Sequence, residues 1–315
     1  MINETKIHTK LLKKHKRFNK DNLELGLLQL PGLLHLFIFS YIPLVFLVIA
    51  FKDYKFNLGV FGSEWCGFDN FKFLLESNTF FTLVRNTLGY NLVFILLSNI
   101  LQLISAILLY NISNKLSIKF FQSSIFLPHF LSWIVIGYIT YAFLNTDIGI
   151  INNILNAMGM KSISFYSEAK YWPVILTVVN MWKSIGFGML VYYGTILSVD
   201  TSLMEAAAIE GCGYLRRIWH IIIPHVKQTT IILIILALGG IFKSDFGLFY
   251  YIPRDIGALY STTDVLDTYI TRSILVTGSL GSSTAAGLLQ SVVGCILVIT
   301  VNKIIKKFNE GDSLF

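Results

Sequence analysis

The residues that could carry out catalysis are scattered along this chain of 315 residues. Its six histidines show no ligand spacing, and neither H-E-x-x-H nor G-x-S-x-G occurs. The sequence also has no Gly-Lys pair and therefore no G-x-x-x-x-G-K-[ST] loop for ATP phosphates. Cys66, Cys212 and Cys295 lie far apart without a C-x-x-C pair, which favours packing roles over a disulfide framework or a zinc site. We expect no catalytic residue, metal or cofactor in this chain.

Two apolar stretches nevertheless carry polar and aromatic side chains suited to binding a polar solute. The first presents four residues at helical spacing on one face, with Trp182 beside them: Asn180, Lys183, Ser184 and Phe187. The second presents Gly240, Ile241 and Ser244 on a comparable face. Aromatic rings beside hydroxyl-binding groups suit a sugar, because a pyranose has apolar faces and a polar rim. The alternative is that the polar groups bridge helices, where a hydrogen bond contributes about 0.6 kcal/mol.

The segment between these stretches predicts a docking element. It reads Ser202-Leu-Met-Glu205-Ala206-Ala207-Ala208-Ile209-Glu210-Gly211. Ser202 and Glu205 form a capping-box pattern, so a short helix can begin at the residue after Ser202. The three alanines favour helix and let another protein approach closely. Gly211 and Gly213 would end this helix, and Pro224 would mark the start of the next one. The alternative is an ordinary connecting loop with a well-capped helix.

The elements that hold these residues are expected to be membrane-spanning helices. The chain is 54% hydrophobic and 14% charged, and its mean hydropathy is +0.65. A spanning helix needs about 20 mainly apolar residues. Six segments meet or approach this requirement: residues 25–51, 86–110, 120–144, 171–199, 228–252 and 273–302. The fifth meets Lys243 and Asp245 and should have a polar outer end. The expected fold is all-α and polytopic, and the first run is too long for a cleaved signal peptide.

Lys183 is the only full charge well inside its apolar segment. A lysine near the centre of a bilayer costs about 2.5 to 3.5 kcal/mol on insertion scales, so it is not expected to face lipid. Both interfaces also lie beyond the reach of its side chain. We expect it to point into a wet cavity or to pair with an acid such as Asp245 or one on another subunit.

The distribution of Lys and Arg predicts the orientation. Fifteen of the 25 fall in residues 1–24, 111–119, 200–227 and 303–315, whereas the loops between these segments hold eight. Because cytoplasmic loops carry the excess of cations, both termini and the 200–227 loop are expected in the cytoplasm. The net charge of +7 is likewise explained by the basic N-terminus rather than by nucleic-acid binding. The expected organisation is a basic segment (1–24), a transmembrane domain (25–305) and a tail (306–315).

The segment at 200–227 resembles the EAA motif of ABC importer permeases, E-A-A-x3-G-x9-I-x-L-P. The matching residues are Glu205, Ala206, Ala207, Gly211, Ile221 and Pro224, with Ile223 in place of Leu. The resemblance extends to residues 31–54, 127–133, 264–269 and 285–294. Together these stretches look like permeases of the carbohydrate-uptake subgroup that handles oligosaccharides and polysaccharide fragments. Glu210 and Cys212 depart from the pattern, which usually has Asp and Ala there.

This resemblance implies a type I ABC importer permease fold in the bacterial cytoplasmic membrane. It implies that the EAA element docks in a groove on an ATP-hydrolysing subunit and transmits its closure. It also implies a substrate site between the helices before and after that element, where Asn180 to Phe187 and Gly240 to Ser244 fall. The implied partners are two ATPase subunits that bind ATP and Mg, a second related permease, an extracytoplasmic sugar-binding protein and membrane lipid.

Three other functions remain open from the residues. An ABC importer for a solute other than a sugar would share the EAA motif. A secondary carrier would be expected to place acids within the membrane for ion coupling, and Asp245 is the only candidate. A membrane enzyme would need polar catalytic groups clustered at one depth, and none stand out. The identity, length and linkage of the sugar are not encoded in these motifs.

Overall fold

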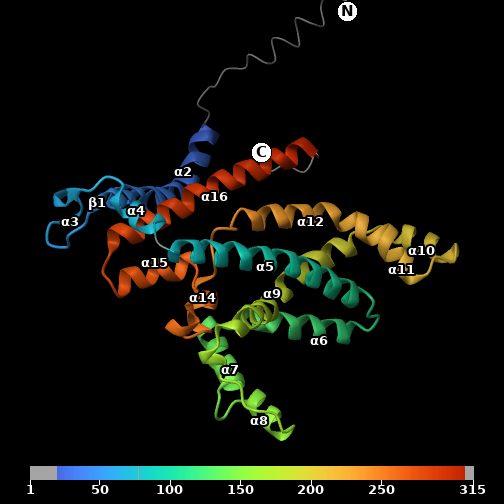
Figure 1. Ribbon diagram of the computed structural model, residues 1–315. Helices are drawn as coiled ribbons and strands as arrows, with labels where there is room; N and C mark the ends of the chain where they lie inside the picture. Colours follow the sequence, from blue (N-terminus) through green and yellow to red (C-terminus); the bar gives the residue numbers. More distant parts are fainter. Residues whose placement is uncertain (1–19, 77, 309–315) are drawn as a thin grey trace, which may run out of the picture. The chain divides into compact units, whose positions relative to one another are not determined.

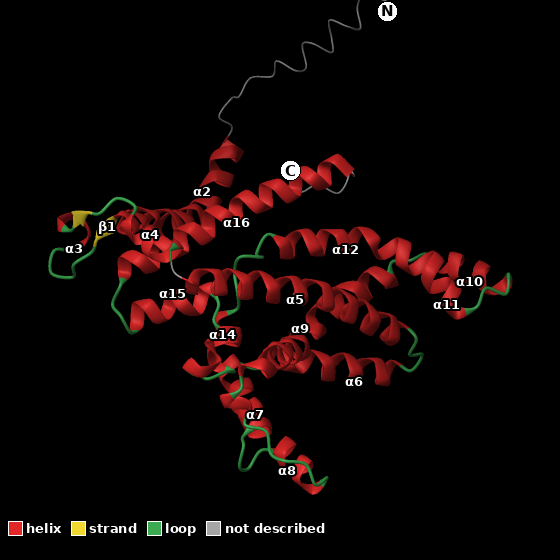
Figure 2. Ribbon diagram, viewed as in Figure 1, coloured by secondary structure: helices red, strands yellow, loops and turns green. Residues whose placement is uncertain are grey.

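The structure is a computed structural model that describes residues 20–76 and 78–308 (Figure 1). The basic segment up to residue 19 and the tail from residue 309, both expected in the cytoplasm, lie outside the described residues. The chain divides after Ile49 into two compact units, which are described separately here. In the described residues the only strands are β1 (Lys52–Asp53) and β2 (Glu64–Trp65), an antiparallel pair in an otherwise helical chain (Figure 2). The all-α class is therefore confirmed.

In the described residues, the first unit is one long helical run. It comprises α2 (Lys20–Leu36), the π-turn η1 (Phe37–Tyr41) and the 3-10 helix η2 (Ile42–Phe51), which continues past the division. The apolar part, Leu25–Phe51, has the predicted bounds. The π-turn stands just before Pro43, which has no N–H to donate and would collide with the carbonyl one turn back. The wider turn, closed by the bond from Ile42 N to Phe37 O, relieves that collision.

The second unit contains the remaining helices. They are α3 (Gly59–Gly62), α4 (Asp69–Leu75), α5 (Asn78–Tyr110), α6 (Lys115–Phe126), η3 (Leu127–Phe130), α7 (Trp133–Leu144), α8 (Ile150–Ala157), η4 (Phe165–Ser167), η5 (Ala169–Tyr171), α9 (Trp172–Leu197), α10 (Thr201–Ile209), α11 (Tyr214–Arg217), η6 (Ile218–Ile222), α12 (Ile223–Leu238), α13 (Phe246–Tyr251), η7 (Gly257–Leu259), α14 (Tyr260–Thr263), α15 (Leu266–Leu275) and α16 (Leu280–Phe308). Among the described residues, five helical runs are long and apolar enough to cross a membrane, or six if one bent pair counts as a span.

That bent pair corrects the predicted third span. The sequence predicts one helix over residues 120–144, but Lys115–Phe130 and Trp133–Leu144 meet at 100°. The chain becomes extended at Leu131 and Ser132, and the Ser132 hydroxyl then caps α7 by accepting from Val135 N at 3.3 Å. A helix cap formed in the middle of an apolar run explains why hydropathy alone missed the break.

The second, fifth and sixth spans also differ from the predicted bounds. The second begins at Thr79, because Arg85 turns its guanidinium to Ser261 O at 2.8 Å and so fits inside α5. The fifth runs over Tyr214–Leu238 and does not reach residue 252. The sixth begins at Leu280 instead of 273, because the start of its apolar run belongs to α15.

The core of the second unit is built on α5 and α9, the two helices that pack most extensively. Glycines on α9 allow other elements to approach it closely. A Cβ on Gly186 would stand 2.5 Å from Ile125 O, and one on Gly188 would stand 2.1 Å from the Gln102 side chain. The helix α9 therefore packs against α6 at Gly186 and against α5 at Gly188, and this packing positions the polar side chains described below.

Candidate functional site

The EAA segment folds as a helix, a tight turn and a second helix, but its start differs from the prediction. The side chain of Asp200 caps α10, accepting at Oδ1 a hydrogen bond from Ser202 N at 2.9 Å. This hydrogen bond holds the pKa of the Asp200 carboxyl below its ordinary value. The predicted capping box of Ser202 and Glu205, with a helix starting at Leu203, is wrong. The reason is that a carboxylate at the N-terminus satisfies the first amides and also favours the positive end of the helix dipole.

The end of α10 agrees with the prediction at Gly211 and differs at Gly213. Gly211 has φ of +72°, a left-handed conformation that favours glycine. Its N–H donates to Ala208 O at 3.1 Å, and Cys212 N donates to Ala207 O at 2.8 Å, which together form a Schellman turn. Gly213 has φ of −63° and begins α11. A Cβ on Gly211 would meet nothing within 4 Å, so only backbone conformation requires a glycine there.

Pro224 is the second residue of α12, but it does not begin the helical run to which α12 belongs. The helical run starts ten residues earlier, at Tyr214, and is continuous to Leu238. The π-turn η6 precedes Pro224 and is closed by the bond from Ile223 N to Ile218 O. As at Pro43, the wide turn accommodates the missing donor, so proline marks a bulge and not a boundary.

Three apolar side chains on the EAA helix pair are exposed. Leu203, Ile209 and Leu215 are 56%, 87% and 70% exposed, and we call these three residues the docking surface. They lie on α10 and α11, at one end of α12 (Figure 1). Leu203 and Ile209 lie outside the apolar spans. Glu205 and Ala206 are exposed beside them. Exposed apolar side chains on both sides of a tight turn are typical of a surface that another protein covers.

Lys183 is bound to the break between η3 and α7. Its Nζ donates to the carbonyl oxygen of His129 at 3.0 Å and also to that of Leu131. It lies 5.0 Å from the centroid of the Trp133 ring. These carbonyls stand where the helical ladder is interrupted, so they would otherwise lack donors. Lys183 therefore has a role that the sequence did not suggest: it donates hydrogen bonds to the backbone carbonyls at a helix break.

Asp245, the acid predicted as a partner of Lys183, accepts a hydrogen bond from Trp133 instead. Trp133 Nε1 donates to Asp245 Oδ2 at 2.8 Å, and Asp245 Oδ1 accepts from Gly247 N at 2.9 Å to cap α13. Among the described residues, Lys183 forms no ion pair with Asp245 or any other acid. The Trp133 ring thus contacts the ammonium with its face and the carboxylate with its N–H.

Phe187 joins Lys183 at the same break. Its ring is 57% exposed and stacks on the His129 ring, with centroids 5.5 Å apart and planes 20° apart. The His129 ring stacks in turn on Phe126 at 5.4 Å. Two of the residues predicted to line a solute pathway therefore lie together, one turn apart on α9.

The other residues predicted on α9 are placed differently. Trp182 is 43% exposed and lines an apolar groove of about 490 Å³ between α7 and α9. The Ser184 hydroxyl is buried and has no partner among the described residues. Asn180 is half-buried, and no hydrogen bond to its side chain is found in the described part of the chain. The predicted face is thus divided between the helix break and the groove.

The residues predicted after α12 form an irregular turn at 239–244. Gly240 and Ser244 belong to this turn, but the Ile241 side chain is buried in a core cluster with Leu83, Phe242 and Leu266. Asn91 Nδ2 donates to Ile241 O at 2.8 Å, and Ser244 N donates to Asp267 Oδ2 at 2.7 Å. The Ser244 hydroxyl is buried and has no partner among the described residues.

The two acids of the 264–269 stretch have structural roles that the sequence did not assign. Asp264 accepts from Thr268 Oγ1 at 2.7 Å and from Arg272, and Asp267 accepts from Gln290 Nε2 at 3.1 Å. Burial raises the pKa of both carboxyls, and these hydrogen bonds oppose the shift. Asp264 thereby ties the start of α15 to side chains further along that helix, and Asp267 ties α15 to α16 and to the turn after α12.

Comparisons with known proteins identify the family. Residues 36–308 match the model of the binding-protein-dependent transport system inner membrane component. The chain is 37% identical to Protein LplB of Bacillus subtilis (strain 168) over 92% of this chain and 91% of that protein. It is 33% identical to the polygalacturonan/rhamnogalacturonan transport system permease protein YteP of the same organism, over 91% and 88%.

Solved structures show the same fold. A crystal structure of a bacterial ABC transporter involved in the import of the acidic polysaccharide alginate contains a chain with a TM-score of 0.84 and 28% identity, covering 92% of this chain and 97% of that one. A second structure, of the alginate transporter with its alginate pentasaccharide-bound periplasmic protein, gives a TM-score of 0.83 and 28% identity over 92% and 96%. This chain belongs to the family of binding-protein-dependent transport system inner membrane components and is a membrane permease subunit of an ABC sugar importer.

Proposed function

We propose that this subunit forms half of a translocation pathway for an oligosaccharide and couples it to ATP hydrolysis through α10. The docking surface carries this proposal. Leu203, Ile209 and Leu215 expose apolar area at a Schellman turn that a cap and a left-handed glycine hold in shape. A preformed element of this kind can transmit a movement of the ATPase subunit to the permease, because its geometry is set before the partner binds.

The proposed complex supplies what this chain lacks. Because the sequence has no phosphate-binding loop, two ATPase subunits would bind ATP and Mg and dock on α10. A second, related permease would supply the other half of the pathway. The excess of Lys and Arg in residues 1–24 and 200–227 supports a cytoplasmic location for α10 and for both termini.

The proposed cargo is an oligosaccharide delivered by an extracytoplasmic binding protein. Support comes from the relatives, one of which is named for polygalacturonan and rhamnogalacturonan and another for alginate with its periplasmic protein. We assign the pathway face to Asn180, Lys183, Ser184 and Phe187 on α9, with Trp182 at the adjoining groove and Gly240 and Ser244 at the turn after α12. The side chain of Ile241 is buried in the core beneath that turn and is left out of the pathway face. Phe187 offers an exposed ring, and Lys183 retains a third donor beyond its two carbonyl contacts.

The coupling proposal is tested in vesicles that contain the whole complex. The binding protein is screened against a glycan panel, and the oligosaccharide it binds is used as cargo for ATP-dependent uptake. We expect Gly211→Val to lower uptake at least about tenfold, because a β-branched residue resists φ of +72° and distorts the turn. Gly211→Asn should retain most uptake, because Asn tolerates that conformation.

Gly159 provides the matched control. It has φ of +76° with open space around it, so Gly159→Val introduces the same strain on the loop after α8. Uptake by Gly159→Val should stay within about twofold of the wild-type rate. Normal uptake and normal ATPase association in Gly211→Val would overturn the coupling role. A binding protein that selects no glycan from the panel would overturn the proposed cargo.

A further inference from the structure

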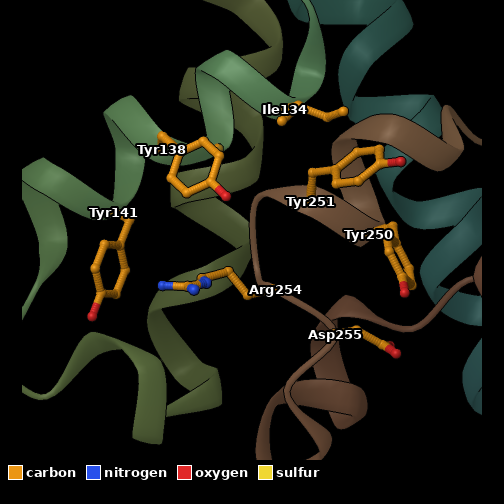
Figure 3. Close-up of a pocket in the computed structure, with 8 residues that line it drawn as sticks. Ile134, Tyr138, Tyr141, Tyr250, Tyr251, Arg254 and Asp255 are labelled. Atoms are coloured by element: carbon orange, nitrogen blue, oxygen red, sulfur yellow. The ribbon is translucent and has the colours of Figure 1, made fainter.

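A cavity of about 210 Å³ opens between α7 and α13, on side chains that the pathway assignment does not use. Figure 3 shows tyrosines from both helices around it, together with Arg254 and Asp255 from the segment that follows α13. The span Tyr214–Leu238 separates this segment from α10. The cavity therefore belongs to the side of the membrane opposite the docking surface, which is the side where delivered cargo would arrive under the proposed function.

Two glycines allow the walls of the cavity, α7 and α13, to approach each other closely. A Cβ on Gly137 would stand 2.8 Å from Tyr251 O, and one on Gly247 would stand 2.1 Å from the Trp133 ring. Gly137 on α7 faces Tyr251 on α13, and Gly247 on α13 faces Trp133 next to it on α7. The two helices therefore approach each other closely at two points one helical turn apart. This close contact fixes Tyr138 and Tyr141 on one wall against Tyr251 on the other.

The side chains of Arg254 and Asp255, which follow α13, carry opposite charges and point in different directions. Arg254 and Asp255 have φ of 60° and 49°, a left-handed conformation that residues other than glycine rarely adopt. Asp255 Oδ1 accepts from Tyr260 OH at 2.9 Å and from Arg272 Nη1 at 3.1 Å. In Figure 3 Arg254 extends toward Tyr141, whereas Asp255 points the other way. The adjacent acid is thus committed to Arg272 and does not neutralise Arg254.

Arg254 is an exposed cation that contacts an aromatic ring and has no acceptor among the described residues. Its guanidinium carbon lies 4.3 Å from the centroid of the Tyr141 ring. Its side chain has no hydrogen bond or ion pair among the described residues. A guanidinium presents a planar fork of donors that matches a carboxylate with two parallel hydrogen bonds. Strained backbone that directs such a group into a cavity is typical of a ligand site.

We propose that this cavity binds one acidic sugar residue, a hexuronate, of the incoming oligosaccharide. The guanidinium of Arg254 takes the carboxylate, and the tyrosine rings supply faces for the pyranose and hydroxyls for its rim. The cavity is smaller than the roughly 300 Å³ at which pockets for larger ligands begin, so it suits one ring of a chain. The tyrosines around the cavity favour a sugar over a free inorganic anion, because an inorganic anion has no apolar face to pack on an aromatic ring. This inference rests on the proposed function and deepens it.

The test measures binding to the assembled permease complex without its binding protein, so that the selectivity of that protein does not mask the cavity. The probes are trigalacturonate and triguluronate, each compared by calorimetry with its fully methyl-esterified, neutral form. Wild-type complex should bind at least one acid about tenfold more tightly than its ester. In Arg254→Asn this preference should fall to about twofold or less, and Asn tolerates the left-handed backbone. Arg254→Lys should retain part of the preference, because it keeps the charge and loses the fork.

Lys161→Asn is the matched control, because Lys161 is an exposed cation on a loop predicted to lie on the same side and does not line the cavity. It should keep the full preference. The proposal is overturned if wild-type complex binds acid and ester equally, if it binds neither acid, or if Arg254→Asn keeps the preference. It is also overturned if Arg254→Asn weakens association of the binding protein and leaves the acid preference unchanged. ATP-driven uptake of a neutral oligosaccharide by the wild-type complex would in those cases leave the proposed function intact.

Discussion

The docking surface and the Arg254 cavity are built in opposite ways. Around α10, the hydrogen bond that the Asp200 side chain accepts spans two residues, and those of the turn at Gly211 span three to five. Around the cavity, Trp133 bonds to an acid 112 residues away. Local sequence chemistry determines the first region, whereas the second exists only when distant helices pack.

This difference teaches where sequence patterns can be trusted in a membrane protein. A cap and a left-handed glycine act on their own helix, so they work in any surroundings. Lys183 acts across helices, on the carbonyls of His129 and Leu131, and its role depends on a break that hydropathy does not reveal. Substitutions in the two regions should therefore have separable effects.

The largest effect is expected from Gly137→Val. A Cβ there would collide with the backbone oxygen of Tyr251, which cannot move without shifting α13. Overpacking of this kind costs about 1 to 3 kcal/mol, and we expect the upper end. Thermal unfolding of the purified complex should show the loss, and the acid preference of the cavity should disappear while ATPase association persists.

Gly194→Val on α9 is the control for Gly137→Val, because a Cβ on Gly194 meets nothing within 4 Å. It should leave both the unfolding temperature and the acid preference close to wild type. Equal destabilisation by the two valines would mean that helix propensity and not close packing governs the region.

A smaller effect is expected from Lys183→Met. The change leaves the carbonyls of His129 and Leu131 without their charged donor, and a hydrogen bond to a charged group contributes about 1.5 to 3 kcal/mol. The unfolding temperature of the complex should fall accordingly. Because Trp133 and not Lys183 binds Asp245, adding Asp245→Asn should not restore stability. Rescue by that second change would show that an ion pair with the acid was the main role of the lysine.

The smallest effect is expected at the N-terminus of α10. Asp200→Ala should lower the stability of this helix by about 1 kcal/mol, because the first amides lose their acceptor. Ser202→Ala should change it by less, since Ser202 takes part through its backbone N–H. Hydrogen exchange of the α10 amides measures both. Faster exchange in Ser202→Ala than in Asp200→Ala would favour the capping box that the sequence first indicated.

The bounds of the membrane spans show how much of the fold the sequence predicts. Residues 25–51 were predicted with the bounds that the structure shows, because a long uncharged run leaves no other boundary signal. The third span was predicted as one unbroken helix, and the fifth was predicted to end at residue 252, whereas it ends at Leu238. In both, a polar side chain caps a new helix within an apolar run, Ser132 before α7 and Asp245 before α13. One polar residue changes mean hydropathy little, yet it supplies the acceptor that lets a helix begin.

The sequence by itself determined the all-α class, the helix–turn–helix element of α10 and α11 and the left-handed turn at Gly211, because each depends on composition or on hydrogen bonds between near neighbours. Only the tertiary structure decided what Lys183 binds, which residues the turn after α12 buries, and that Arg254 faces a cavity while Asp255 turns away. These depend on which helices meet and at what separation. Side-chain volume and backbone approach, as at Gly137 and Gly247, set that separation, and no local pattern records it.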